Sequence, residues 1–163
     1  MGKIKKKLLV IGGTGFIGHH LIKEALKKNW KITSASLSIP TKKKRLNRVK
    51  YYKVDIRSVL SVNKKLKKSF DYVVNLGGYI DHASFKDKGR KIIQEHFLSV
   101  QYLIRTLPRK NLKKFVQIGT SHEYGLAPAP QKENLKETPV SAYSFAKAAT
   151  TNFLQTLHKT ENF

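Results

Sequence analysis

A glycine-rich turn near the start of the chain restricts its fold more than any other feature. The apolar run 7–11 leads into Gly12-Gly13-Thr14-Gly15-Phe16-Ile17-Gly18, and apolar residues then recur at helical spacing up to residue 28. In such a strand–turn–helix unit, Gly12 permits the tight turn, Gly15 lets the backbone approach a pyrophosphate, and Gly18 lets the helix pack closely. The phosphates then lie at the helix N-terminus, where N–H groups and the helix dipole favour negative charge. The turn therefore predicts a dinucleotide site, with a purely structural turn as the alternative.

The remainder of the chain alternates strand-like and helix-like segments. Strands are expected at 7–11, 30–37, 49–54, 70–76 and 114–118, and helices at 16–28, 59–66, 88–107 and 140–159. The strand segments are continuous apolar runs, which are typical of a parallel sheet with helices on both faces. The sequence predicts an α/β fold with a doubly wound, Rossmann-like parallel sheet, and its length suits one domain over residues 1–163.

The charge of the chain is strongly one-sided. Lysine and arginine number 33 against 10 acidic residues, and the net charge of +23 raises the question of a nucleic-acid partner. The excess is mostly lysine and recurs in segments expected to meet water, arginine is scarce, and no nucleic-acid-reading motif is present. We interpret the lysines as a solvated surface with nonspecific attraction to polyanions, and we expect no specific nucleic-acid partner.

The absence of cysteine excludes disulfides and thiolate metal sites, and it suits a reducing compartment. No metal site is expected. The apolar run that follows the basic start is only 8–11, which is too short for a signal peptide or a membrane span. We therefore expect a cytoplasmic protein without a membrane partner.

The end of the second expected strand bears on which dinucleotide is bound. NAD-preferring domains place an acidic residue there to bind the ribose 2′-hydroxyl. Ser36 occupies that position here, and the basic run 42–45 follows it. A hydroxyl and cations suit the 2′-phosphate of NADP. The sequence therefore favours NADP over NAD, with membership of 42–45 in the general lysine excess as the alternative.

A tyrosine and a lysine four residues apart lie in the last expected helix. Tyr143 and Lys147 share one helix face, so a phenol and an ammonium can share one site. A nearby cation stabilises phenolate, and we expect it to lower the pKa of Tyr143 toward a range useful for proton transfer. By itself, this spacing also arises by chance on a lysine-rich helix.

Further motifs place these residues in a known context. Besides the glycine turn and the Tyr143–Lys147 pair, the chain carries Val54-Asp55-Ile56, Asn75-Leu76-Gly77-Gly78 and Gly119-Thr120-Ser121-His122-Glu123-Tyr124-Gly125, in that order. In these motifs it resembles the extended short-chain dehydrogenase/reductase superfamily over essentially its whole length. Within that superfamily it is similar to the NAD-dependent epimerase/dehydratase family, which acts on nucleotide sugars.

The resemblance implies a role for each matching residue. Tyr143 would be the catalytic acid/base, Lys147 would hold the nicotinamide ribose and lower the pKa of Tyr143, and Thr120 would hydrogen-bond the reacting oxygen. Asp55 and Ile56 would contact the adenine, although Asp55 could equally cap a helix and Thr120 could be an ordinary hydroxyl after a strand. The residues expected to bind NADP or NAD are Gly12, Thr14, Gly15, Phe16, Ile17, Gly18, Ser36, Asp55, Ile56, Leu76, Gly77, Gly78, Tyr143 and Lys147.

The chain also departs from the family's pattern. The family's 4,6-dehydratases carry Asp-Glu directly after the catalytic Ser/Thr, and Ser121 and His122 stand there instead, which disfavours dehydration. His96 occupies a position where the family often has asparagine, which puts the network that asparagine supports in doubt. Family members continue into a C-terminal lobe that binds the nucleotide sugar. We therefore expect a chain truncated just past the Tyr143 helix, without that lobe.

These implications lead to an enzyme that acts on a nucleotide sugar or, as a second enzymatic possibility, on a dihydroflavonol-like or steroid-like alcohol, with one non-enzymatic alternative. The expected function is NAD(P)-dependent epimerisation or carbonyl reduction of a nucleotide sugar, and the resemblance leaves room for a homodimer. Truncation leaves open whether this chain turns over substrate. The alternative is a non-catalytic dinucleotide- or polyanion-binding module with a retained Rossmann fold, and the presence of Thr120, Tyr143 and Lys147 together argues against it.

Overall fold

The computed structural model describes residues 5–161 of the chain. Backbone contacts divide the chain into two compact units. The sheet unit comprises Met1–Gly77 and Leu103–Ile118, and the helix unit comprises Gly78–Tyr102 and Gly119–Phe163. Within residues 5–161, no helix is long and apolar enough to cross a membrane.

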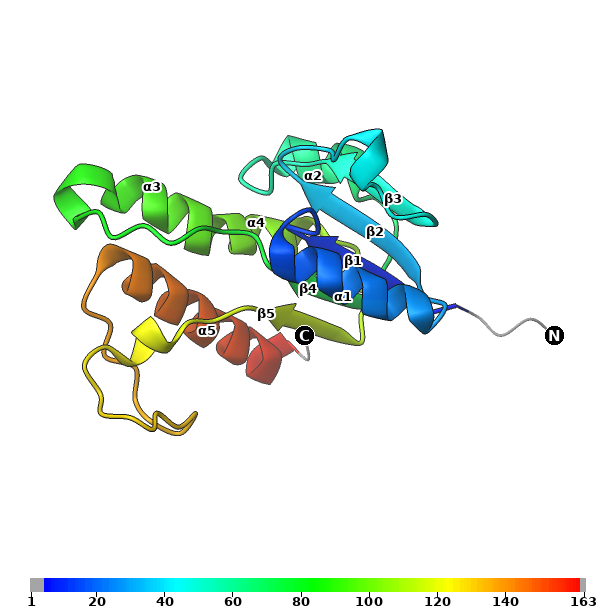
Figure 1. Cartoon of the computed structure of the whole chain (residues 1–163). Helices are drawn as coiled ribbons and strands as arrows, with labels where there is room; N and C mark the ends of the chain where they lie inside the picture. The colour runs from blue at the N-terminus through cyan, green and yellow to red at the C-terminus, as the bar shows by residue number, and fades with distance from the viewer. Residues whose placement is uncertain (1–4, 162–163) are drawn as a thin grey trace. The chain divides into compact units, whose positions relative to one another are not determined.

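The sheet unit is built on five parallel strands (Figure 1). In spatial order these are β3 (Val49–Lys53), β2 (Lys31–Ser36), β1 (Lys7–Ile11), β4 (Tyr72–Asn75) and β5 (Lys114–Gln117). The register places Leu9 opposite both Thr33 and Val73. Because the strand order reverses direction at β1, this arrangement confirms the predicted doubly wound, Rossmann-like sheet.

Both faces of this sheet are covered, because successive side chains of a strand point to opposite faces. Leu8 and Val10 share an apolar core with α1 (Phe16–Lys27), whereas Leu9 shares the other core with α2 (Val59–Lys65). Each of these strand side chains is almost completely removed from water, which contributes about 1.5–3 kcal/mol per side chain to folding. The central strand is therefore fixed from both sides, and so is the turn that follows it.

The helix unit contains two π-helical turns where the sequence predicts one continuous helix over 88–107. The chain forms a π-helical turn at Phe85–Gly89, α3 at Arg90–Ile93, a second π-helical turn at Gln94–Leu98, and then α4 at Ser99–Thr106. In the second turn, the Glu95 carbonyl accepts a hydrogen bond from the Ser99 hydroxyl at 2.6 Å, and the His96 carbonyl accepts one from Thr150 Oγ1 at 2.7 Å. The predicted helical segment is therefore present, but two π-helical turns interrupt it, and in the second of them hydroxyls bond the helix carbonyls.

The last helix, α5 (Ala142–Glu161), begins two residues after the expected start. The hydroxyl of Ser141 accepts a hydrogen bond from the Ser144 N–H at 3.1 Å and so caps the helix. A short 3₁₀ turn at Ser121–Tyr124, which the sequence analysis does not anticipate, lies earlier in the same unit. The cap places Tyr143 in the first turn of α5.

Candidate functional site

The carboxyl ends of four neighbouring strands carry most of the predicted cofactor residues. The Gly12 N–H donates to the Ala35 carbonyl at 2.8 Å, and the Leu76 N–H donates to the Ile11 carbonyl at 3.0 Å. Backbone hydrogen bonds between neighbouring strands thus continue to the first residue after β1 and after β4. These bonds fix where the connecting turns begin. The glycine turn after β1, Ser36 at the end of β2, Asp55 after β3 and Leu76 after β4 therefore meet at one edge of the sheet unit, where doubly wound sheets bind ligands.

Two of the glycines in the turn after β1 are required by the fold itself. Gly12 has a φ of +74°, a conformation that side chains disfavour. A Cβ on Gly18 would lie 2.5 Å from the Gly12 carbonyl oxygen and 2.6 Å from Gly13 Cα, so only glycine fits there. Gly15 differs, because a Cβ there would meet only the Gly12 carbonyl oxygen, at 3.3 Å. A purely structural turn therefore requires glycine at positions 12 and 18 and favours it only weakly at position 15.

The beginning of α1 is open to an anion. Gly15 is its N-cap residue and makes no side-chain cap, and the first helical hydrogen bond runs from the His19 N–H to the Gly15 carbonyl at 2.9 Å. The N–H groups of 16–18 precede that bond and are available to a ligand. Phe16 and Ile17 are exposed, and no acidic residue occurs in this first turn. These features fit the pyrophosphate of a dinucleotide.

Ser36 and the basic run both lie beside the glycine turn. The Thr14 N–H donates to Ser36 Oγ at 3.4 Å. A hollow of about 390 Å³ is lined by Gly13 and Thr14 together with Lys43, Lys44 and Arg45. The basic run 42–45 thus contributes cations to a hollow that reaches the turn.

Asp55 does not cap α2, which removes one of its two expected roles. Ser58 is the cap, and its hydroxyl accepts a hydrogen bond from the Ser61 N–H at 3.2 Å. The Asp55 carboxylate is instead held by Arg57 through Nε at 2.9 Å and Nη2 at 2.7 Å, and these hydrogen bonds lower the pKa of Asp55 below its usual value. Contact of Asp55 and Ile56 with an adenine stays a prediction.

The turn after β4 is organised by a buried asparagine. Asn75 is 1% exposed; its Oδ1 accepts a hydrogen bond from the Gly77 N–H at 3.0 Å, and its Nδ2 donates to Gln117 Oε1 at 2.8 Å. This asparagine fixes the path of Leu76 and Gly77 at the sheet edge. Gly78, the next predicted cofactor residue, belongs to the helix unit and has a φ of +140°.

The three predicted catalytic residues all lie in the helix unit. Tyr143 and Lys147 are one turn apart on α5 and are 7% and 6% exposed. Thr120 caps the turn Ser121–Tyr124, and its side chain lies near enough to Tyr143 to act on the pKa of that phenol. The structure therefore places a half-buried hydroxyl near a buried phenol, with a buried ammonium one helical turn away.

The pKa shifts in this cluster differ from the sequence-based expectation. Burial raises the pKa of Tyr143, the hydrogen bond with Thr120 opposes that rise, and the charge of Glu123 adds to it. Burial lowers the pKa of Lys147, and Glu123 opposes that shift. The expected lowering of the Tyr143 pKa is absent from this structure, because the cost of burying a phenolate outweighs the effects that favour it.

Glu123 is a buried carboxylate that the sequence analysis missed. It is 5% exposed; its Oε1 accepts the Thr120 N–H at 2.8 Å, and its Oε2 accepts the Thr151 hydroxyl at 2.7 Å. With Thr120 it forms a capping box, in which each of the two side chains accepts a hydrogen bond from a backbone N–H of the same turn. The sequence signal for it is a threonine followed three residues later by glutamate, and it was available at 120–123.

His96 lies against Tyr143. It is 2% exposed, its ring stands edge-on to the Tyr143 ring with centroids 5.1 Å apart, and it sits in the π-helical turn Gln94–Leu98. Neither ring nitrogen makes a well-formed hydrogen bond to a residue within 5–161. Burial lowers the pKa of His96, and the charge of Lys147 adds to that shift. The charges of Glu95 and Asp81 and the backbone of Tyr79 oppose it more weakly. The sequence marked this position as unusual but gave no sign of its contact with Tyr143.

Known proteins resemble the chain over nearly its whole length. The model of the NAD dependent epimerase/dehydratase family matches residues 8–163. A dTDP-D-glucose 4,6-dehydratase of Dictyostelium discoideum is 32% identical over 94% of this chain and 41% of its own length. A UDP-glucose 4-epimerase of Lactobacillus helveticus is 25% identical over 86% of this chain and 44% of its own length. The chain thus spans less than half the length of these relatives.

A solved structure gives the same picture. The UDP-N-acetylglucosamine 4-epimerase of Methanobrevibacter ruminantium, determined in complex with UDP-N-acetylmuramic acid, has a TM-score of 0.82 with this chain at 27% identity. The match covers 98% of this chain and 52% of the epimerase. The fold described above is therefore the fold of about half of that enzyme.

Proposed function

The chain belongs to the NAD-dependent epimerase/dehydratase family, and we propose that it carries the cofactor-binding and catalytic residues of an NAD(P)-dependent epimerase or carbonyl reductase. The observation that carries this proposal is the buried pair of Tyr143 and Lys147 on one helix, with the half-buried Thr120 near Tyr143. Buried ionisable groups with shifted pKa values are typical of functional sites. Because its relatives are named for nucleotide-sugar reactions, a nucleotide sugar is the proposed substrate class.

Within this proposal, Tyr143 exchanges a proton with the substrate. The nicotinamide dinucleotide supplies hydride transfer when it is bound. Because burial raises the pKa of Tyr143, the phenol keeps its proton at neutral pH and can donate it to a carbonyl oxygen. Thr120 Oγ1 hydrogen-bonds the same oxygen, and the Lys147 ammonium, one helical turn away, favours the phenolate that remains.

We propose epimerisation or carbonyl reduction over dehydration. Ser121 and His122 stand where the family's dehydratases carry their acidic pair. Glu123 does not take over that role, because both of its carboxylate oxygens already accept hydrogen bonds, from the Thr120 N–H and the Thr151 hydroxyl. The helix unit therefore offers Tyr143 as its proton donor.

We propose NADP as the preferred cofactor, bound by the glycine turn. The support is the hollow in which Lys43, Lys44 and Arg45 lie beside Gly13 and Thr14, since cations there suit a 2′-phosphate. Ser36→Asp should weaken NADPH binding and strengthen NADH binding, whereas Ser38→Asp, which adds the same charge at an exposed position two residues on, should change both much less. If Ser36→Asp leaves the NADPH to NADH affinity ratio unchanged, the assignment of Ser36 is wrong.

Binding and turnover test the main proposal separately. Fluorescence titration of the chain with NADPH and NADH should give a dissociation constant below millimolar for at least one of them. Binding of neither would overturn the assignment of the glycine turn. For catalysis, in a protein completed with a C-terminal lobe, Tyr143→Phe should abolish turnover of a nucleotide sugar while leaving cofactor affinity nearly unchanged. An unchanged rate in that variant would remove Tyr143 from the mechanism, and cofactor binding without any turnover by the completed protein would favour the non-catalytic binding module.

Three broader points complete the proposal. Residues 1–163 form one NAD(P)-binding domain, and the chain assembles as a homodimer. Its compartment is the cytoplasm, whose reducing conditions suit a chain without cysteine. Sedimentation equilibrium of the purified chain tests the assembly, and a purely monomeric result would contradict it.

A further inference from the structure

The positive charge of the chain belongs almost entirely to one of its two units. The sheet unit holds 25 lysine and arginine residues against 3 acidic ones, a net charge of +22, whereas the helix unit holds 8 against 7, a net charge of +1. If lysine were simply favoured at every exposed position, both units would carry a large positive charge. The lysines are therefore concentrated on the sheet unit.

Seven of these lysines surround a single hollow of about 280 Å³ in the sheet unit. Lys7 and Lys31 are the first residues of β1 and β2 and lie opposite each other in the register, and Lys50 is the second residue of β3. The other four come from the end of α2 and the segment after it, within 64–68. The hollow therefore lies toward the amino ends of the strands, at the opposite edge from the glycine turn.

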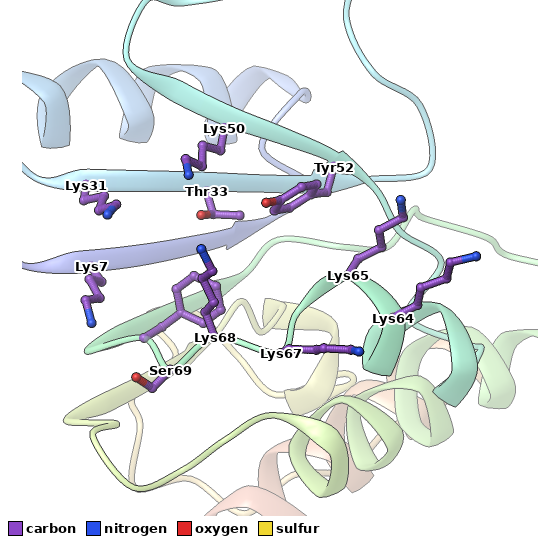
Figure 2. Close-up of a pocket in the computed structure, with 11 residues that line it drawn as sticks. Lys7, Lys31, Thr33, Lys50, Tyr52, Lys64, Lys65, Lys67, Lys68 and Ser69 are labelled. Atoms are coloured by element: carbon purple, nitrogen blue, oxygen red, sulfur yellow. The ribbon is translucent and has the colours of Figure 1, made fainter.

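The floor of the hollow is neutral and partly aromatic. Lys31, Thr33 and Ala35 alternate onto one face of β2, and Ala35 belongs to the apolar core on that face, so the hollow continues this face beyond the core. Tyr52 is half-buried and lines the hollow, as does Phe70, which is 7% exposed. Figure 2 shows Thr33 and Tyr52 between Lys31 at one end and Lys64 and Lys65 at the other, with Lys50 beside Thr33.

The cations around the hollow are not neutralised by the protein. None of its eleven lining residues is acidic. In the described part of the chain, none of the seven lysines forms an ion pair. The carboxylate of Asp71, adjacent in sequence to Phe70, is hydrogen-bonded by the Lys7 backbone N–H at 2.7 Å. Seven like charges around one hollow repel one another, and an anionic ligand would relieve that repulsion.

We propose that this hollow binds single-stranded nucleic acid, with phosphates on the lysines and one base against Tyr52. The strand lysines extend across three adjacent strands, about 10 Å, which is longer than one phosphate group needs. A cationic groove with an aromatic side chain in its floor is the arrangement by which proteins bind single strands without reading sequence. Exposed lysines bind phosphates as flexible point charges, so the binding is independent of base sequence.

The test compares two variants that remove the same number of charges from the same unit. The hollow variant is Lys31→Gln, Lys64→Gln and Lys67→Gln, and the control variant is Lys28→Gln, Lys110→Gln and Lys113→Gln, three exposed lysines outside the hollow. Fluorescence anisotropy with a labelled oligothymidylate of about ten nucleotides gives the affinity. The hollow variant should bind on the order of tenfold more weakly than the control variant and lose about 2 from the slope of log affinity against log salt. Equal affinities would overturn the proposal, because binding would then depend on net charge alone.

The aromatic contact needs its own measurement. Tyr52→Leu keeps an apolar side chain against the core and removes the ring, and it should weaken binding of the oligothymidylate about fivefold or more. The same variant should bind an abasic oligonucleotide of equal length as well as the parent does. Thermal unfolding of the variant identifies any loss that comes from the fold. Equal affinity of the parent for the oligothymidylate and for inorganic polyphosphate of matched charge would overturn the proposal in favour of a general polyanion site.

Discussion

The sheet unit and the helix unit place their charges in opposite ways. The sheet unit has a net charge of +22 and keeps its lysines in water, and the cofactor contacts proposed for it are largely backbone N–H groups and exposed side chains. The helix unit is nearly neutral, yet it buries Lys147, Glu123 and His96 around Tyr143. Charges in water can be exchanged at little cost to the fold, whereas buried ones depend on one another. Substitutions of charged residues should therefore cost more stability in the helix unit than in the sheet unit.

The largest effect is expected at Glu123. Glu123→Ala leaves the Thr120 N–H and the Thr151 hydroxyl without their acceptor and removes the carboxylate that favours the charged form of Lys147. An unsatisfied group costs about 1–3 kcal/mol when buried, and both donors are part-buried, so together they should lower the free energy of unfolding by about 3 kcal/mol in a urea titration. Glu133→Ala, at an exposed position in the same unit, should change it by less than about 0.5 kcal/mol. A similar loss in both variants would show that burial does not distinguish these carboxylates.

The glycine turn provides a matched test within the sheet unit. A methyl group at Gly18 would collide with the backbone of Gly12 and Gly13, so Gly18→Ala should lower the free energy of unfolding by about 2 kcal/mol. Gly15→Ala places its methyl group 3.3 Å from a single oxygen and should cost less than about 1 kcal/mol. If the turn binds a dinucleotide, Gly15→Ala should nevertheless weaken NADPH binding in a fluorescence titration. Unchanged binding would make this turn a structural feature only.

The sequence could predict features that depend on local patterns, but not those that depend on packing between distant segments. The five strands and the glycine turn depend on local patterns, and the expected strand at 7–11 coincides with β1. Tyr143, Lys147 and Thr120 are recognisable from their spacing and surroundings. The contact of His96 with Tyr143 joins residues 47 positions apart, and His96 lies in a π-helical turn whose carbonyl accepts a hydrogen bond from the Thr150 hydroxyl. No local sequence pattern encodes such a contact. The raised pKa of Tyr143 could not be predicted either, because it results from burial, which depends on how distant segments pack.

His96 should make the stability of the chain depend on pH. Burial lowers its pKa in the folded chain, so the unfolded chain binds a proton at a higher pH than the folded chain does. The contribution is fully present above the ordinary histidine pKa of about 6.5, and it is lost as the pH falls toward the lowered value. The slope of unfolding free energy against pH should reach about 1.4 kcal/mol per pH unit at most in that window.

Two substitutions isolate this contribution. His96→Asn introduces the residue that the family often carries at this position, and it should remove the slope below about pH 6.5 in urea titrations. His20→Asn replaces an exposed histidine of the sheet unit and should keep the pH dependence of the parent chain. An unchanged slope in His96→Asn would mean that the buried imidazole is not the group that titrates.

The smallest effect is expected at the Asp55–Arg57 ion pair of the sheet unit. Its geometry is good, with Nη2 and Oδ2 2.7 Å apart, but its side chains remain 37% and 34% exposed. Water and salt screen such a pair, so a double-mutant cycle of Asp55→Asn and Arg57→Gln should give a coupling of about 0.5 kcal/mol, smaller still in high salt. The lowered pKa of Asp55 adds a second signature, since this contribution is present above the usual carboxyl pKa and disappears as the pH falls below it. A coupling near 3 kcal/mol would erase the difference between the units, because a partly exposed pair would then be worth as much as the buried hydrogen bonds of Glu123.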